Sequence, residues 1–380
     1  MTAGEQGRSA IQGPVGQNES GAAISGRDLR FVAIWAVSIL LLYAIGSYFA
    51  VRQLQGYKAE TQRIRRARIR AAAASSAGAS RQAAATPTKV TVGIYVYRIG
   101  QFSLREGIWA ADFDIWFRWT GNKLSPGDTF QIVNGEIDSR ERKEAYSSAR
   151  ERYERYHVNA HFTQYIDASR FPFSDEALII EVEDGIHGAA TLRYVADKRS
   201  SGFSSSAIPP ALHITRSLAG VNQSVYRSSL GDPRMTAGVA ADAYSRYVFA
   251  MLARPHGGWV FVGMFQALFA AVLIALLAAF IRPIYGDGRF GLGIGAFFAA
   301  VGNNVFVASM IPPPSRLTLT AMVNGIGLAT IALTLIQSII SLQVYGMGKE
   351  KLSVLFDKVS FVVLLVGYAT ISLLLPLTAR

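Results

Sequence analysis

Five uninterrupted apolar stretches constrain this sequence more than any other feature. Each stretch lacks Asp, Glu, Lys and Arg and reaches the roughly 20 residues that a helix needs to cross a bilayer. They are Phe31–Val51, Trp259–Phe280, Phe290–Ile311, Leu317–Gly346 and Val359–Ala379. Backbone groups in hydrocarbon must bond within their own segment, so we expect five transmembrane helices. The alternative is a set of buried helices in a large soluble protein, but soluble cores rarely hold five such runs.

The first stretch follows a polar, Gly/Ser-rich leader that spans residues 1–28. Its apolar run is longer than that of a signal peptide, and basic residues follow it closely. We therefore interpret residues 29–52 as an uncleaved membrane anchor, or signal-anchor. Cleavage as a signal peptide is the alternative, because the Ala/Ser-rich tract behind the anchor offers small residues for a cleavage site.

Half of the formal net charge of +12 lies directly behind this anchor. Seven basic residues oppose Glu60 and leave +6: Arg52, Lys58, Arg63, Arg65, Arg66, Arg68 and Arg70. The nearby aromatic is Tyr57 alone and no binding fold surrounds the run, so nucleic-acid binding is disfavoured. A juxtamembrane basic run more often touches lipid headgroups or sets orientation. We expect residues 53–88 to form a linker, basic and then Ala/Ser-rich; for the Ala/Ser-rich part, 71–86, a continuing weak helix is the alternative.

Residues 89–256, between the first and second spans, have the period of strands. The odd positions from Trp109 to Trp119 are all apolar, while Asp112, Asp114 and Arg118 occupy even positions. The same alternation recurs in 156–166 and 178–183, and turn signals such as Gly121-Asn122 separate the runs. We predict an antiparallel, immunoglobulin-like β-sandwich. The charged stretch 141–155 is compatible with a helix or with a strand connection.

Catalysis and metal binding have little support in the residues. The chain has no cysteine, which excludes disulfides, zinc knuckles, iron–sulfur ligation and thiol nucleophiles. His157 and His161 share one strand face, but no third metal ligand is evident. No nucleophile elbow or phosphate-binding loop appears. We expect no catalytic residue, no metal, no cofactor and no enzymatic activity.

Four local motifs resemble a known family in their order and spacing. They are the strand Phe113–Trp119 with its turn at 120–122, the loop Arg170–Asp175, Arg254 before the second span, and the helix Arg289–Ile311 with prolines at 312–314. Over about 290 residues, from Lys89 to Ala379, the chain resembles the pentameric ligand-gated ion channels. The prokaryotic members of that superfamily, which lack the cysteine pair of the animal receptors, are the most similar in pattern.

The resemblance implies a homopentamer in which residues 257–380 form a four-helix transmembrane pore domain. Helix 289–311 would line a central pore, with Asp287 and Arg289 as charged rings at its narrow end. The pore-facing positions implied by the family are Gly291, Gly295, Phe298, Gly302, Val305 and Ser309. Five Phe298 rings would form an apolar constriction able to close by dewetting. Alternatively, Gly291, Gly295 and Ala299 form a small-residue face for close helix packing.

The resemblance also implies how a ligand signal reaches the pore. The loop at the base of the sandwich would press against the loop between the third and fourth spans. The coupling residues are Phe171, Pro172, Phe173, Asp175, Arg254, Pro312, Pro313 and Pro314. The ligand site would lie between neighbouring sandwiches, with Trp116, Tyr226, Tyr244 and His187 as candidates and the loop 228–244 as a flap. Protonation of His157, His161, Glu181 or Asp184 is a second candidate stimulus.

We therefore expect a ligand-gated or pH-gated ion channel and receptor in a bacterial inner membrane, with the sandwich on the periplasmic side. Its expected partners are membrane lipid, further copies of itself, inorganic ions and a small ligand or proton, and not nucleic acid. The alternative is a non-conducting, membrane-anchored sensor or binding scaffold on the same fold. Orientation contains a conflict: the loops of the last four spans obey the positive-inside rule, but the +6 run would then lie outside.

Overall fold

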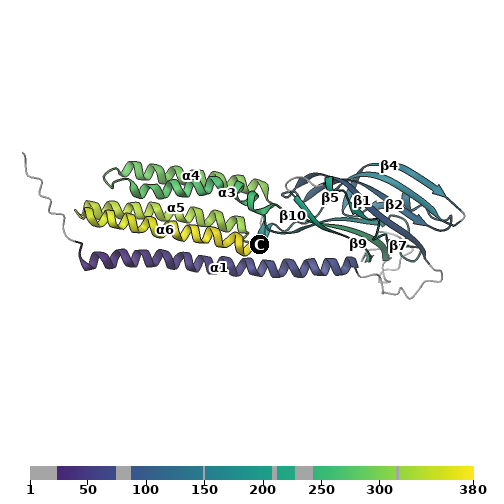
Figure 1. Ribbon diagram of the computed structural model, residues 1–380, viewed down its shortest axis with the longest axis horizontal. Helices are drawn as coiled ribbons and strands as arrows, with labels where there is room; N and C mark the ends of the chain where they lie inside the picture. The colour runs from purple at the N-terminus through teal and green to yellow at the C-terminus, as the bar shows by residue number, and fades with distance from the viewer. Residues whose placement is uncertain (1–23, 74–86, 149, 208–211, 227–242, 314–315) are drawn as a thin grey trace, which may run out of the picture.

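The computed structural model describes residues 24–73, 87–148, 150–207, 212–226, 243–313 and 316–380. The molecule has two parts arranged along one long axis: a domain of two β-sheets and a group of five long helices (Figure 1). The chain begins its described course at the far end of the helices. The C-terminus lies where the helices meet the sheet domain.

Within the described residues, one sheet has six strands and the other has four. The larger sheet follows the order β4 (Gly135–Ser147), β5 (Arg152–Thr163), β2 (Ile108–Trp119), β1 (Thr88–Ser103) and β7 (Leu192–Ala196), with β8 (Gly202–Phe203) also paired to β1. The smaller follows β3 (Phe130–Ile132), β6 (Glu176–Asp184), β10 (Ala243–Pro255) and β9 (Leu212–Val225). Short helices occupy α2 (Pro126–Thr129), η1 (Ala168–Arg170) and η2 (Ser205–Ala207). The described residues of the charged stretch 141–155 form no helix: they contain the end of β4 and the start of β5, which pair with each other.

The period-two pattern is confirmed by burial. The odd-numbered apolar side chains of β2, Trp109, Phe113 and Phe117 among them, are buried in a core that also contains Ile180 and Phe249 of the smaller sheet. Burial of each such side chain contributes about 1.5–3 kcal/mol, so this shared core holds the two sheets together.

The five helices are long and apolar enough to cross a membrane. They are α1 (Gly26–Ala73), α3 (Gly257–Leu277, extended by η3, Ala278–Phe280), α4 (Gly286–Met310), α5 (Leu319–Gly346) and α6 (Glu350–Ala379). Helix α1 does not end near Arg52: of the range 53–88 expected as a linker, residues up to Ala73 continue the helix. At about 1.5 Å per residue this adds roughly 30 Å beyond the apolar stretch, and α1 reaches the sheet domain (Figure 1).

Helix α1 is packed against the other helices and is more than a tether. The Trp35 indole N–H donates to Ser360 Oγ of α6 at 3.0 Å, and the Tyr43 hydroxyl shares a hydrogen bond of 2.6 Å with Thr330 of α5. Gly367 of α6 leaves room for the Tyr43 ring, since a Cβ at that position would lie 2.4 Å from the ring. These contacts fix the register of α1 along α6.

Candidate functional site

The predicted pore stripe lies on the face of α4 that no other described helix covers. Phe298 and Val305 are 68% and 65% exposed. A Cβ added at Gly291, Gly295 or Gly302 would meet nothing within 4 Å. Ser309 is exposed on the same side, at the end of the helix nearest the sheet domain. The structure therefore brings all six predicted positions onto one free face of the single chain.

The opposite face of α4 carries its contacts with the chain. Its buried residues are Gly293, Ala296, Ala300, Asn303 and Val307, together with Arg289. At Gly293 an added Cβ would lie 2.3 Å from Leu335 of α5, and Asn303 Nδ2 donates to Asn324 Oδ1 of α5 at 3.2 Å. Packing within the chain thus uses Gly293, whereas the alternative small-residue face of Gly291, Gly295 and Ala299 points away from it.

Arg289 differs from the expectation of a charged ring at the pore mouth. Its side chain is 1% exposed and forms an ion pair with Asp357 of α6. Its Nε also donates to the Ile281 carbonyl at 2.7 Å, while Gln337 of α5 donates to the same aspartate. A guanidinium is costly in an apolar interior unless it is paired, and Asp357 supplies that pairing inside the helix group. Asp287, two residues earlier, is exposed and remains compatible with a position at the mouth.

The junction between the sheet domain and the helices is built around the loop 171–175. Arg254, at the end of β10, holds Asp175 in a two-point ion pair, with Nε–Oδ1 at 2.6 Å and Nη2–Oδ2 at 3.0 Å. The Phe173 ring packs on Phe261 of α3 with centroids 5.7 Å apart. Phe171 and Phe173 both join the core of the helix group. The predicted coupling loop therefore contacts the first helix that follows the sheet domain.

The end of α4 is also tied to the rest of the chain, through residues that the sequence did not indicate. Arg105, in the turn between β1 and β2, donates to the Ser309 carbonyl at 3.2 Å. Arg316, just before α5, pairs with Glu60 of α1 at 2.5 Å and lies over the Tyr57 ring. Pro312 and Pro313 follow directly after α4, whereas Pro314 lies outside the described residues.

Trp116 lines a cavity of ≈ 300 Å³ on the outer face of the six-stranded sheet. Its ring lies across Gly93 of β1, where an added Cβ would fall 2.1 Å from the indole, and its Nε1 donates to Asp197 Oδ2 at 3.3 Å. The other lining residues are mostly aromatic or charged: Tyr95, Tyr97, Asp114, Arg118, Tyr153, Arg155, Asp197 and Ser200. This composition suits a small polar or cationic ligand.

Asp114 is the buried carboxylate of this cavity. It accepts hydrogen bonds from the Tyr97 hydroxyl at 3.0 Å, and its other oxygen lies 2.9 Å from His157 Nδ1. Burial and the bond to Asp114 raise the pKa of Tyr97. Desolvation raises the pKa of Asp197, but hydrogen bonds from Ser200 and Trp116 outweigh it and leave that pKa below its ordinary value.

The other ligand-site candidates lie on or next to the smaller sheet. Within one chain they do not line the cavity of Trp116. The rings of Tyr226 and Tyr244 lie edge to face at 5.6 Å, at the ends of β9 and β10. The Tyr226 hydroxyl donates to Glu183 at 2.7 Å, and Arg246 pairs with both Glu183 and Glu181. Residues 228–242 of the expected flap lie outside the described residues.

His187 and the two strand histidines are each held by carboxylates. His187 Nδ1 lies 2.9 Å from Asp184, and His161 Nδ1 lies 2.8 Å from Asp138. Within the described ranges, no group of three or more His, Cys, Asp or Glu side chains is arranged to hold a metal ion.

No protein-family model matches the chain, and no curated protein gives a significant match to its sequence. The features of the molecule that bear on its function are the free face of α4, the junction and the Trp116 cavity.

Proposed function

We propose that this chain is one subunit of a homopentameric ion channel gated by a small ligand or by protons. In this proposal the two sheets form an immunoglobulin-like sandwich, α3–α6 form the transmembrane pore unit, and α1 is an additional anchor. The observation that carries the proposal is the free face of α4. Phe298 projects from that face beside glycines, opposite the face that packs on α5.

The composition of α4 supports a pore rather than lipid on that face. By mean hydropathy α4 is the least apolar of the five spans. Ser309 is exposed on that face, and polar groups inside a membrane generally face protein or water rather than lipid. Five copies placed around an axis would surround it with Phe298 rings, and such an apolar constriction closes by excluding water.

Coupling in the proposed channel runs through the junction. A ligand that binds one state of the sandwiches better than the other shifts the equilibrium between closed and open pores. The loop 171–175 contacts α3, Arg105 contacts the end of α4, and Glu60 of α1 contacts Arg316 before α5. Through these three contacts the sandwich and α1 directly touch the first part of α3, the end of α4 and the connection between α4 and α5.

The proposed ligand site lies between copies. The Trp116 cavity is on the larger sheet of one subunit, and the pair Tyr226 and Tyr244 is on the smaller sheet of its neighbour. The two halves belong to different sheets of one chain, so a shared site requires a second copy. Proton gating would act through His157, which contacts the buried Asp114 beside the same cavity.

The proposed location is a bacterial inner membrane with the sandwich on the periplasmic side. Asp28, near the start of α1, pairs with Lys349 before α6 at 2.7 Å, so both lie at the end of the helices away from the sheet domain. That end also carries Arg282, Lys351 and Lys358, as the positive-inside rule requires of a cytoplasmic side. A reporter inserted at Ala79 is expected to be periplasmic, and a cytoplasmic signal would overturn this topology.

The alternative proposal is a non-conducting sensor or scaffold on the same fold. Glycine at positions 291 and 295 favours it, because these residues offer no side-chain oxygen to a passing ion. The packing of α1 along α6 also adds a membrane anchor that a pore does not need.

Recording from purified full-length protein in planar bilayers separates the two proposals. Current that Phe298→Ala alters, and that Phe297→Ala on the neighbouring face leaves unchanged, supports the pore. Gly295→Ser is expected to raise conductance, because it adds a hydroxyl to the lining. In detergent the particle mass is expected to be five times the 41.2 kDa of one chain. A different stoichiometry, or silence across ligands and pH, contradicts the channel.

A further inference from the structure

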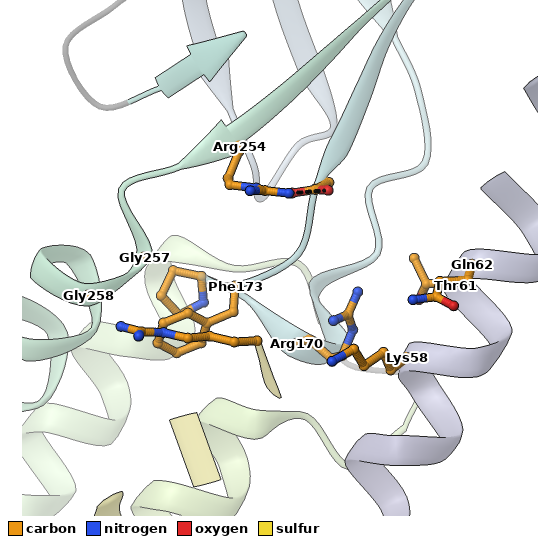
Figure 2. A pocket seen from close by; sticks show the side chains of 11 residues that line it. Lys58, Thr61, Gln62, Arg170, Phe173, Arg254, Gly257 and Gly258 are labelled. Carbon is orange, nitrogen blue, oxygen red and sulfur yellow. Dashed lines mark hydrogen bonds and ion pairs between the residues drawn. The ribbon is translucent and has the colours of Figure 1, made fainter. Parts of the chain in front are cut away.

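A second cavity, of ≈ 500 Å³, lies where α1, the loop 171–175 and the start of α3 meet. Four basic side chains line it: Lys58, Arg170, Arg254 and Arg380. Asp175 is the one carboxylate side chain among the lining residues, and it is engaged by Arg254. Figure 2 shows Lys58 and Arg170 pointing into the same space between the loop and α1.

Arg170 is the residue that marks this cavity as a binding site. It is 6% exposed, and its Nη1 donates to the Ala379 carbonyl at 2.9 Å. Its Nε is buried without a hydrogen-bond partner among the described residues. A buried donor left unpaired costs about 1–3 kcal/mol, more when the group is charged, so this N–H calls for an acceptor.

Among the side chains that line the cavity, basic groups outnumber carboxylates four to one. Desolvation lowers the pKa of Arg170, against the attraction of Asp167, Asp175 and Glu176. Arg380 lies over the Phe173 ring at 5.4 Å, and Lys58 forms no ion pair within the part of the chain that the structure describes. Thr61 and Gln62 add neutral hydrogen-bonding groups to the wall.

The cavity lies at the end of the apolar helices that adjoins the sheet domain, where a membrane that these helices cross would have its lipid headgroups. Gly257 and Gly258 in its wall begin α3, and Arg380 follows the end of α6, so both spans start or stop there. The adjacent Trp259 is 84% exposed, as tryptophans are at the boundary between a membrane and water.

We propose that this cavity binds a phosphate group, supplied by the headgroup of an anionic phospholipid or by a free phosphate anion. Arg170 and Lys58 hold its oxygens with charge-assisted hydrogen bonds, and Thr61 and Gln62 contact the rest of the headgroup. Phosphate oxygens suit these donors because each accepts from guanidinium and ammonium groups at once. The site stands whether or not α4 lines a pore.

The test adds ligand stepwise to full-length protein in detergent and measures the thermal unfolding midpoint at each ligand concentration. Phosphatidylglycerol, phosphatidylcholine and inorganic phosphate are added separately, because specific binding to the folded state raises the midpoint. Phosphatidylglycerol is expected to raise the midpoint and phosphatidylcholine to leave it unchanged. If inorganic phosphate raises the midpoint as phosphatidylglycerol does, or competes with the lipid, a free phosphate anion is sufficient for binding. If inorganic phosphate does neither, the ligand is the lipid.

Variants locate the effect in the cavity. Lys58→Gln and Arg170→Gln are each expected to weaken the binding about tenfold, the loss of one charge-assisted hydrogen bond. Arg63→Gln removes a charge from the same helix outside the cavity and is the matched control. Because Arg170 is buried, Lys58→Gln decides the matter if Arg170→Gln does not fold. No shift with either anion, or equal weakening by Arg63→Gln and Lys58→Gln, overturns the proposal.

Discussion

Glu60 of α1 and Arg316, in the connection between α4 and α5, form an ion pair with an Oε2–Nη1 distance of 2.5 Å. Arg316 also lies over the Tyr57 ring of α1, 5.3 Å from its centroid. One helical turn after Tyr57, the Thr61 hydroxyl donates to Asp167 at 3.2 Å. Asp167 directly precedes η1 of the sheet domain. Helix α1 therefore touches both partners of the proposed coupling between sandwich and pore.

Removing this ion pair is expected to change gating without unfolding the protein. Exposed pairs contribute about 0–1 kcal/mol, so Glu60→Gln is expected to leave the thermal midpoint nearly unchanged. In the proposed channel it shifts the ligand or proton concentration for half-maximal current severalfold. The exchanged pair Glu60→Arg with Arg316→Glu is expected to restore the wild-type value. Identical responses of wild type and Glu60→Gln would remove α1 from the coupling route.

A substitution at Gly367, which leaves room for the Tyr43 ring, tests whether α1 packs as part of the helix group. Gly367→Ala places a methyl 2.4 Å from the Tyr43 ring and is expected to destabilise the protein by about 1–3 kcal/mol. Gly263→Ala in α3 is the matched control, since an added Cβ there meets nothing within 4 Å. Thermal unfolding in one detergent compares the two. Equal midpoints for both variants would show that α1 packs elsewhere.

Removing one charge of the buried pair Arg289 and Asp357 is expected to destabilise the protein more than removing both charges. Arg289→Met leaves Asp357 charged and buried, which costs about 3–5 kcal/mol. The double variant Arg289→Met with Asp357→Leu removes both charges and is expected to recover most of the stability. Yield of folded protein and its thermal midpoint measure both effects. A single variant as stable as wild type would place Arg289 in contact with water.

Gly93 is expected to be essential to the Trp116 cavity. Gly93→Ala places a methyl 2.1 Å from the indole, so the ring must leave its position over β1. The expected cost is about 1–3 kcal/mol of stability, together with loss of the ligand response. Gly202→Ala, whose Cβ would lie 3.8 Å from Tyr95, is a control at ordinary contact distance in the same sheet. A full ligand response in Gly93→Ala would exclude Trp116 from the site.

Asp197 predicts a dependence of stability on acid. Its folded-state pKa lies below the ordinary value of 3.8, so the charged form is favoured in the folded protein. The resulting stabilisation is present above that ordinary value and is lost as the pH falls through the folded-state pKa. Wild type is therefore expected to be more stable than Asp197→Asn at neutral pH, with the difference closing below about pH 4. Thermal midpoints measured from neutral pH to pH 3 check this, and a gap that widens in acid contradicts it.

Local patterns in the sequence were sufficient for the elements. The absence of charge over 20 residues indicates a span wherever it occurs, and the alternation around Trp116 indicates a strand, because both depend on near neighbours in the chain. The resemblance implied the stripe from Gly291 to Ser309, and its helical spacing puts those positions on one face. These predictions agree with the helices, the strand and the exposed face of α4.

The sequence did not indicate which elements pack against each other. Nothing near Arg289 indicates that Asp357, 68 positions away, neutralises it inside the helix group, and so its expected place at the pore mouth differs from the one observed. The basic run after the anchor suggested contact with lipid, but not that Lys58 would meet Arg170 across a cavity. The extension of α1 to Ala73 brought those two residues together.

The sequence by itself determined that this protein has five apolar spans and a strand domain, because hydrophobic period and charge are local properties of the chain. The tertiary structure decided what α1 does. Tyr43 fits against Gly367, Glu60 reaches Arg316, and Lys58 reaches the cavity around Arg170. Each of these contacts joins residues far apart in the sequence, and such contacts arise from the packing of whole helices, which no local pattern encodes.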